Sequence, residues 1–265
     1  MTGLRVTRAV GRSAGRAAIS IAAVLLLWIA ALRVFDIPAF VGKSPMDVAD
    51  YFFTLPKAAQ NRSEALGLLG TTLTDALLGF VAGLAVALVV AAVFLLFRPL
   101  ESALLPMVLL LQSVPLIAIA PILVLIFGRT SVTVAVMGGL VVLFPALVNI
   151  VFGLRSAPTA ALDLVTVYGA GRWQTLRKVA VPAAVPALFA AVRISAPGAI
   201  TGALIAEWLA TGQGIGYAIV AAVGESRINA VWGLAVLITL ATLLIYQLVG
   251  VVESAVLARM GFTQA

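Results

Sequence analysis

The chain has 265 residues, of which 63% are hydrophobic and 10% are charged, and its formal net charge is +7. A soluble domain averages roughly 45–50% apolar and about 25% charged residues, so this composition predicts a protein whose solvent is lipid. Neither cysteine nor histidine occurs, which excludes disulfides, thiolate or histidine metal sites, and catalysis that uses a histidine base.

Six apolar segments come close to, or exceed, the roughly 20 helical residues needed to cross a hydrocarbon core. They cover residues 17–35, 69–97, 102–128, 130–154, 183–209 and 228–252. Arginines before an apolar run are also typical of a secretory signal peptide, but no small-residue cleavage site follows, so we expect an uncleaved first span. The predicted fold class is an all-α membrane protein with six transmembrane helices in a single domain, residues 1–265.

The basic residues outside the predicted spans are divided unequally between the two sides of the membrane. One side holds both termini and carries Arg5, Arg8, Arg12, Arg16, Arg98, Arg155, Arg172, Arg177, Lys178 and Arg259. The other side carries Arg33, Lys43, Lys57, Arg62, Arg129 and Arg227. The positive-inside rule therefore predicts a multi-pass plasma-membrane protein with cytoplasmic N- and C-termini, and the positive charge needs no nucleic-acid partner.

A short helix is predicted on the side opposite the termini, at about residues 44–57. Ser44 would cap it and Pro45 would occupy its first turn. Asp47 and Asp50 would favour its N-terminal end electrostatically. Because apolar residues recur along this segment, we expect the helix to lie on the outer membrane surface.

Two segments contain parts of nucleotide-binding motifs, but neither motif is complete. The G-K-S triplet at residues 42–44 lacks the earlier glycine of a phosphate-binding loop, because position 37 is Ile37. The G-x-G-x-G stretch at residues 212–216 has Tyr217 where the third glycine of a dinucleotide fingerprint is required. We therefore expect no catalytic, cofactor-binding or metal-binding residue, and energy for uphill transport would come from an ion gradient or another subunit.

The polar stretch between the fourth and fifth spans, residues 155–182, is the strongest functional signal in the chain. Apolar residues at helical spacing predict a first short helix that ends near Tyr168. The Gly-Ala-Gly run at residues 169–171 would break it, and residues 172–178 would form a second helix. A new helix could then start at Pro182. From the pattern alone, this loop is either a contact site for a soluble partner or an amphipathic connector at the lipid surface.

The segment from Asp163 to Pro182, D-L-V-T-V-Y-G-A-G-R-W-Q-T-L-R-K-V-A-V-P, resembles the EAA loop of binding-protein-dependent ABC importer permeases. Gly169 matches the glycine of that motif and Pro182 its final proline. Asp163 stands where glutamate is usual, and residues 164–165 are bulkier than the usual Ala-Ala. Further similarity to the nitrate-, sulfonate- and taurine-type permeases lies at residues 44–48, 112–121, 193–195, 206–208 and 214–217.

This resemblance implies a type I ABC importer permease fold in a bacterial inner membrane, with a cytoplasmic coupling loop. It implies that a small solute, such as a sulfonate or nitrate, moves inward, and that ATP is hydrolysed by a partner, so the chain itself is not an enzyme. The implied partners are two cytoplasmic ATP-binding subunits, a second permease chain (a homodimer or a close relative), an extracytoplasmic solute-binding protein and membrane lipid. The loop residues implied in coupling are Asp163, Tyr168, Gly169, Gly171, Arg172, Trp173 and Pro182.

Polar residues at membrane depth are candidates for the translocation pathway. Gln112 and Ser113 lie between prolines of the third span, which would bend that helix. Arg193 and Glu207 lie roughly 21 Å apart along a straight fifth helix, so each needs a partner elsewhere. Arg193 would suit an anionic solute or would reach the inner headgroups. Glu207 would line the pathway or bind amides near residues 212–216.

Two other classes of membrane protein are the alternatives to an ABC permease. An ion-coupled secondary transporter would work without an ATPase, but such carriers usually show inverted repeats and more buried carboxylates. A membrane-embedded enzyme is disfavoured because histidine, cysteine and clustered carboxylates are missing from the sequence.

Overall fold

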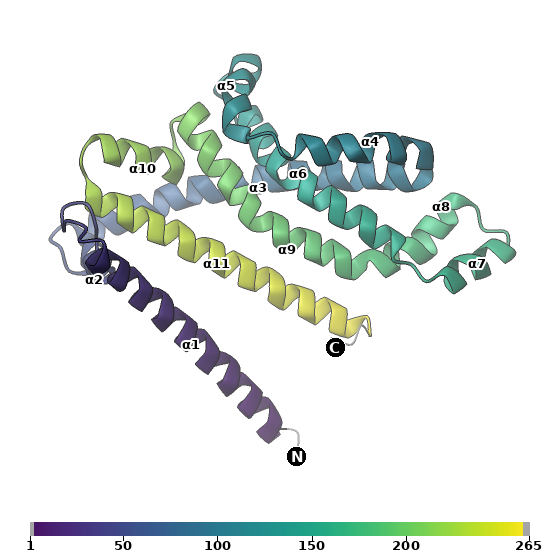
Figure 1. The fold of residues 1–265 in the computed structure, drawn as a ribbon, viewed down its shortest axis with the longest axis horizontal. Coiled ribbons are helices and arrows are strands. Elements are labelled where there is room, and N and C mark those ends of the chain that lie inside the picture. Colours follow the sequence, from purple (N-terminus) through teal and green to yellow (C-terminus); the bar gives the residue numbers. More distant parts are fainter. Residues whose placement is uncertain (1–2, 262–265) are drawn as a thin grey trace.

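The computed structural model describes residues 3–261, and within that range every regular element is a helix (Figure 1). The long helices are α1 (Gly3–Val34), α3 (Ala58–Leu96), α6 (Ser131–Arg155), α9 (Val181–Ala206) and α11 (Ile228–Arg259). The shorter helices are α2 (Pro45–Phe53), α4 (Arg98–Leu111), α5 (Leu116–Phe127), α7 (Thr159–Val167), α8 (Arg172–Thr175) and α10 (Gly214–Gly224), and π-helical turns flank α9 at η1 (Leu176–Ala180) and η2 (Glu207–Thr211). The predicted all-α fold class is confirmed, while residues 1–2 and 262–265 of the predicted domain lie outside the described residues.

Among the described residues, four helical stretches are long and apolar enough to cross a membrane: Ala58–Leu96, Ser131–Arg155, Arg172–Thr211 and Ile228–Arg259. They overlap the second, fourth, fifth and sixth predicted spans. α4 and α5 together would make a fifth span, although they are bent by 102° relative to each other. The apolar part of α1, Ile19–Val34, is shorter than these stretches, and the first span stays a prediction.

The third predicted span, residues 102–128, is not one continuous helix. α4 ends at Leu111, and Pro115 begins α5 from an extended conformation with φ −62° and ψ 119°. Proline has no amide hydrogen and disfavours helical geometry in the residue before it, so the helix breaks at the Val114–Pro115 step. Pro106 and Pro121, by contrast, lie inside their helices without a break.

Glycine contacts join α3, α6 and α9 at the centre of the bundle. Gly79 of α3 lies against Gly138 of α6, and a Cβ added to Gly79 would lie 2.7 Å from the Gly138 Cα. Gly83 lies against Gly139 in the same way, and Gly202 of α9 also reaches Gly138. Apolar side chains gain little by leaving lipid for protein, so this close backbone packing is a main source of helix association in a membrane.

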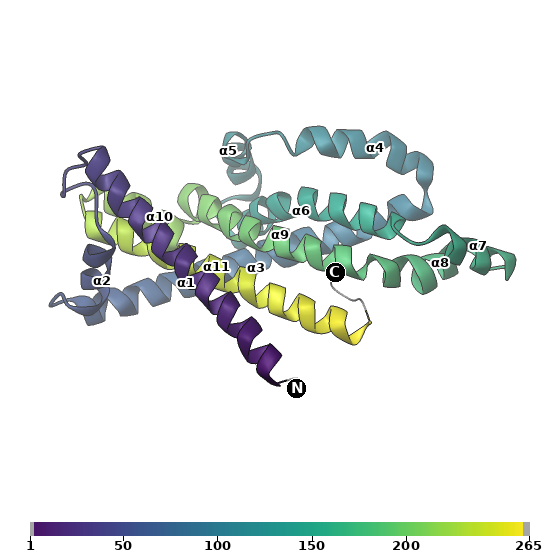
Figure 2. The same ribbon diagram turned by 60° about the horizontal axis from the view of Figure 1, so that its bottom comes forward.

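The bundle has two distinct ends. α2 and α10 lie at one end, and α7 and α8 project from the other, in both Figure 1 and Figure 2. The C-terminal end of α1 and the N-terminal end of α11 lie near α2. From there both helices extend in the direction of α7 and α8. The predicted surface helix and the loop of residues 155–182 therefore lie at opposite ends.

The predicted capping of α2 is confirmed. The Ser44 hydroxyl accepts a hydrogen bond from the Asp47 amide at 3.3 Å, and an Asp47 oxygen accepts one from the Ser44 amide at 2.7 Å. This reciprocal arrangement is a capping box. The hydrogen bonds from the Ser44 side chain and backbone lower the pKa of the Asp47 carboxyl, because they favour its ionised form. The helix ends at Phe53, a few residues before the predicted boundary.

Candidate functional site

The loop between α6 and α9 forms the predicted helix, glycine turn and second helix. After α7, Gly169 adopts a left-handed conformation with φ +76°, which costs little only in glycine. The Gly169 amide donates to the Thr166 carbonyl and the Ala170 amide donates to the Val165 carbonyl, each at 2.9 Å. These bonds satisfy carbonyls at the end of α7 and set the direction of the chain into α8.

The surface of this loop is exposed and rich in apolar side chains. Val167 is 84% exposed, Tyr168 is 83% exposed and Trp173 is 62% exposed. Neither α7 nor α8 contains a buried residue; Asp163 in α7 is exposed, and so is Gly171, which precedes α8. A patch of this kind on a projecting segment is typical of an interaction site.

One of the predicted coupling residues, Arg172, also holds the loop to the bundle. Arg172 Nη1 donates a 3.0 Å hydrogen bond to the Leu96 carbonyl at the end of α3. Pro182 lies in the first turn of α9, as the sequence predicts, but no break precedes it, because Arg172–Thr211 is one continuous helical stretch. The π turn η1, closed by a bond from the Val181 amide to the Leu176 carbonyl, widens the helix just before the proline ring and so avoids its clash with the preceding turn.

The start of the loop has a partner that the sequence did not single out. Arg155, the last residue of α6, forms an ion pair with Glu101 of α4, with 2.5 Å between Nη2 and Oε2. Glu101 is only 2% exposed. In the sequence, Glu101 is marked only by its position just after the helix start at Arg98-Pro99. That position does not identify Arg155 as its partner.

Glu207 lies fully buried at the N-terminal end of α10. Its Oε2 accepts a 2.7 Å hydrogen bond from the Gly216 amide, and the adjacent Ile215 amide donates to Thr72 of α3 at 2.9 Å. A helix N-terminus leaves amides without partners and favours negative charge, so both side chains cap α10 from a distance. The predicted alternative, a bond from Glu207 to amides near residues 212–216, is thus confirmed, and its role in translocation stays a prediction.

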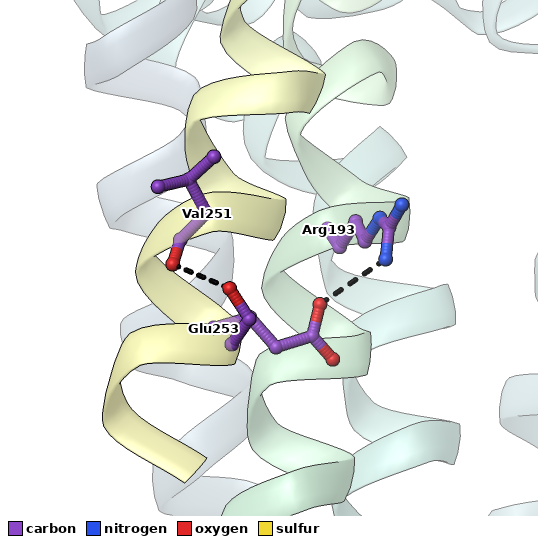
Figure 3. A network of polar contacts seen from close by, with 4 residues as sticks. Arg193, Val251 and Glu253 are labelled. Carbon is purple, nitrogen blue, oxygen red and sulfur yellow. Dashed lines mark hydrogen bonds and ion pairs between the residues drawn. The ribbon is translucent and has the colours of Figure 1, made fainter. Parts of the chain in front are cut away.

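Arg193 has a charged partner in the next transmembrane helix (Figure 3). Its Nη1 lies 3.3 Å from Glu253 Oε2 on α11, and its guanidinium lies 4.5 Å from the ring centre of Tyr246. Gly250 also faces this guanidinium, as expected from the helical spacing of residues 246, 250 and 253. Because Glu253 compensates the positive charge, Arg193 no longer argues for an anionic solute. The predicted sixth span ends at residue 252, one residue before Glu253.

The remaining pathway candidates lie at the break between α4 and α5. Gln112 and Ser113 are both exposed there, and the Ser113 hydroxyl donates to the Leu110 carbonyl at 2.7 Å. Within residues 19–261, no hydrogen bond joins Gln112, Ser113, Arg193 and Glu207 to one another. The four candidates do not form one polar cluster.

Comparison with known proteins places these features among transport permeases. Residues 79–261 match the family described as binding-protein-dependent transport system inner membrane component. The riboflavin transport system permease protein RibX of Chloroflexus aurantiacus is 32% identical over 229 residues, which are 86% of this chain and 84% of that protein. A probable ABC transporter permease protein of Haemophilus influenzae is 29% identical over 222 residues, which are 84% of this chain and 88% of that protein.

A similar fold occurs in a structure of inward-facing conformations of the MetNI methionine ABC transporter. The TM-score is 0.57, and the match covers 77% of this chain and 99% of that chain. The two sequences are 21% identical over this match. The comparison therefore supports the fold, including the type I permease architecture, and leaves the solute open.

Proposed function

Because this chain belongs to the family of binding-protein-dependent transport system inner membrane components, we propose that a separate ATP-hydrolysing subunit docks on its α7–α8 loop and drives solute inward. The chain itself is the permease subunit of an ABC importer. The observation that carries the docking proposal is the exposed apolar surface of Val167, Tyr168 and Trp173 on a projecting loop. Aromatic side chains of this kind are enriched at the centres of protein interfaces.

The proposed assembly contains two permease chains. One chain contributes one α7–α8 loop, whereas a motor made of two ATP-binding subunits would engage two such loops. The second permease chain would be an identical copy or a close relative. A solute-binding protein would then deliver its cargo at the opposite end of the bundle, near α2 and α10.

The proposed orientation puts α7 and α8 in the cytoplasm of a bacterial cell, together with both termini. Support comes from the larger number of basic residues predicted for that side. Since the chain has no cysteine, Trp173→Cys and Met46→Cys can each carry a single reactive label. A membrane-impermeant maleimide should modify the residue-46 thiol in intact cells and the residue-173 thiol only after permeabilisation. The opposite pattern would refute the docking proposal.

The docking surface is tested by Tyr168→Asp and by Gly169→Glu. Each variant should insert into the membrane normally but lose copurification of the ATP-binding subunit, because one places a charge in the apolar patch and the other strains the φ +76° turn. Gly224→Glu is the matched control, since Gly224 lies at the end of α10 with open space around it. ATPase copurification with Tyr168→Asp at the native level would contradict the proposal.

The solute has two testable candidates. Sequence resemblance favours a small anion such as a sulfonate, whereas a relative with 32% identity is named for riboflavin. Cells that express the complete transport system should accumulate either radiolabelled taurine or radiolabelled riboflavin, and Gly169→Glu should abolish that uptake. Uptake that persists after deletion of the ATP-binding subunit would instead support the alternative, an ion-coupled secondary transporter.

A further inference from the structure

We propose that Glu101 is a positioning residue that ties α4 to the coupling loop, so that α4 moves when the loop moves. This inference rests on the proposed docking of an ATP-binding subunit on α7 and α8. It extends that function to α4, which lies outside the loop.

The first observation concerns how α4 is attached. Glu101 is the only buried residue of this helix, whereas Met107 is 56% exposed and Leu110 is 71% exposed. Apolar side chains gain little by leaving lipid for a protein surface, so the apolar face of α4 does not itself fix the helix in place. Leu105 and Val108 of α4 are partly buried against the core of the bundle, and the buried carboxylate adds the specific polar attachment of this helix.

The second observation concerns the partner of that carboxylate. Glu101 Oε2 and Arg155 Nη2 are 2.5 Å apart, and Arg155 is the residue at which α6 ends and the loop begins. The other Glu101 oxygen, Oε1, is buried without a hydrogen-bond partner. Loss of Arg155 would leave a buried charge uncompensated, which the surroundings tolerate poorly. The ion pair therefore has to persist when the loop is displaced.

The third observation shows that the second helix of the loop, α8, contacts the same corner. Arg172 donates a 3.0 Å hydrogen bond to the Leu96 carbonyl. The chain leaves its helical conformation at Phe97, with φ −127° and ψ 79°, and starts α4 at Arg98. The six residues 96–101 thus contact both the first residue of the loop and the first residue of α8.

The packing of α5, the helix that follows α4, indicates where a displacement of α4 would be transmitted. The helix leads through the break at residues 112–115 into α5. Ala120 of α5 packs with Met137 of α6 and with Ala206, the residue just before Glu207. A displacement of α4 would therefore be passed to α5 and to the region beside the buried Glu207 cap.

The test uses pairs of spin labels in the assembled transporter, in lipid nanodiscs, with and without Mg-ATP and vanadate. One pair, at Met107→Cys and Leu77→Cys, measures the distance between α4 and α3. The other pair, at Leu164→Cys and Leu77→Cys, measures the distance between α7 and α3. All three sites are more than half exposed, at 56%, 61% and 58% respectively for residues 107, 77 and 164, and the chain has no other cysteine.

In the native chain, both label distances should shift when nucleotide is trapped. With Glu101→Gln, the α7 shift should remain and the α4 shift should be lost, because the amide cannot form the ion pair. The swap Glu101→Arg with Arg155→Glu should restore the α4 shift at least in part. Arg98→Gln, which changes an exposed arginine on the same helix, should leave both shifts intact.

The possible results separate the two proposals. A native α7 shift without any α4 shift would overturn the role of Glu101 alone. An α4 shift that survives in Glu101→Gln would also overturn it. No nucleotide-dependent α7 shift in the native chain would contradict the docking proposal, and the role of Glu101 with it. If Glu101→Gln fails to fold, the swap Glu101→Arg with Arg155→Glu still tests the ion pair, and loss of the α4 shift in a folded swap variant would overturn the role of Glu101.

Discussion

The Glu207 carboxylate and the Gly216 amide are joined by a 2.7 Å hydrogen bond, although nine residues and a left-handed turn separate them in the chain. The bond places a buried carboxyl oxygen at the start of α10, where the first backbone amides have no partner within the helix. Thr72 from α3 holds the neighbouring amide. α10 is therefore fixed to two long helices at once.

Replacement of Glu207 should destabilise the protein more when the new side chain has no oxygen that can accept from the Gly216 amide. Glu207→Gln keeps a carbonyl that can accept from Gly216, whereas Glu207→Ala leaves a buried amide without a partner, which costs about 1–3 kcal/mol. Unfolding of the purified chain in detergent, followed by tryptophan fluorescence, should rank native, Gln and Ala in that order of decreasing stability. Equal midpoints for Ala and the native chain would show that the cap contributes nothing.

Gly214→Ala should be more harmful than its size suggests. Gly214 has φ +74°, and an added Cβ would collide with the Glu207 carboxylate. A non-glycine residue in such a conformation costs about 1–3 kcal/mol before the collision is considered. Gly224→Ala is the control, because open space surrounds Gly224. The same fluorescence measurement should show a clear loss for residue 214 and little change for residue 224; similar losses would contradict the structure.

Arg193 and Glu253 should show an energetic coupling in a double-mutant cycle. Their side chains are 37% and 16% exposed, so we expect a coupling of about 1 kcal/mol or less, typical of partly solvated pairs. Glu253→Gln alone should destabilise the chain more than Glu253→Gln combined with Arg193→Gln, because the single change leaves an unpaired cation. Strictly additive effects of the two changes would rule out the ion pair.

The start of α2 should loosen in acid. Because its hydrogen bonds to Ser44 lower the pKa of Asp47, the capping box is fully present above the ordinary pKa of an aspartate and is lost as the pH falls through the lowered value. A spin label at Met46→Cys should become more mobile over that range. Asp47→Asn should make the label mobile already at neutral pH, and Ser44→Ala should cost about 1 kcal/mol of local stability.

Asp50→Asn provides the control for this experiment. Asp50 bonds to Thr54 at the other end of α2 and takes no part in the capping box. Its replacement should leave the acid transition of the label unchanged. A transition that disappears in Asp50→Asn, or that persists in Asp47→Asn, would assign the acid response to another group.

The features that the sequence predicted well depend on residues close together in the chain. The capping box of α2 lies within four residues, and the turn at Gly169 follows from one glycine between two short amphipathic stretches. The helices α6 and α11 begin within a residue or two of their predicted starts, because apolar runs bounded by polar residues fix them. The family assignment rested on the same kind of local motif.

The features that the sequence missed depend on residues far apart in the chain. Thr72 and Ile215 are separated by 143 positions, so nothing near the glycines of residues 212–216 indicated a helix capped from α3. Arg193 and Glu253 lie 60 positions apart. The break between α4 and α5 is a different case, since its prolines indicated a bend while the size of the bend depends on packing.

The glycine contacts of α3, α6 and α9 limit how this chain can change shape. Where the Gly79, Gly138 and Gly202 backbones touch, no flexible side chain is available to absorb sliding, and any shear would open a void that neither water nor lipid could fill cheaply. These three helices would therefore turn as a rigid unit during a transport cycle. Hinge motion would be confined to the connections around that unit, and a gate would open between two such units instead of through the middle of one.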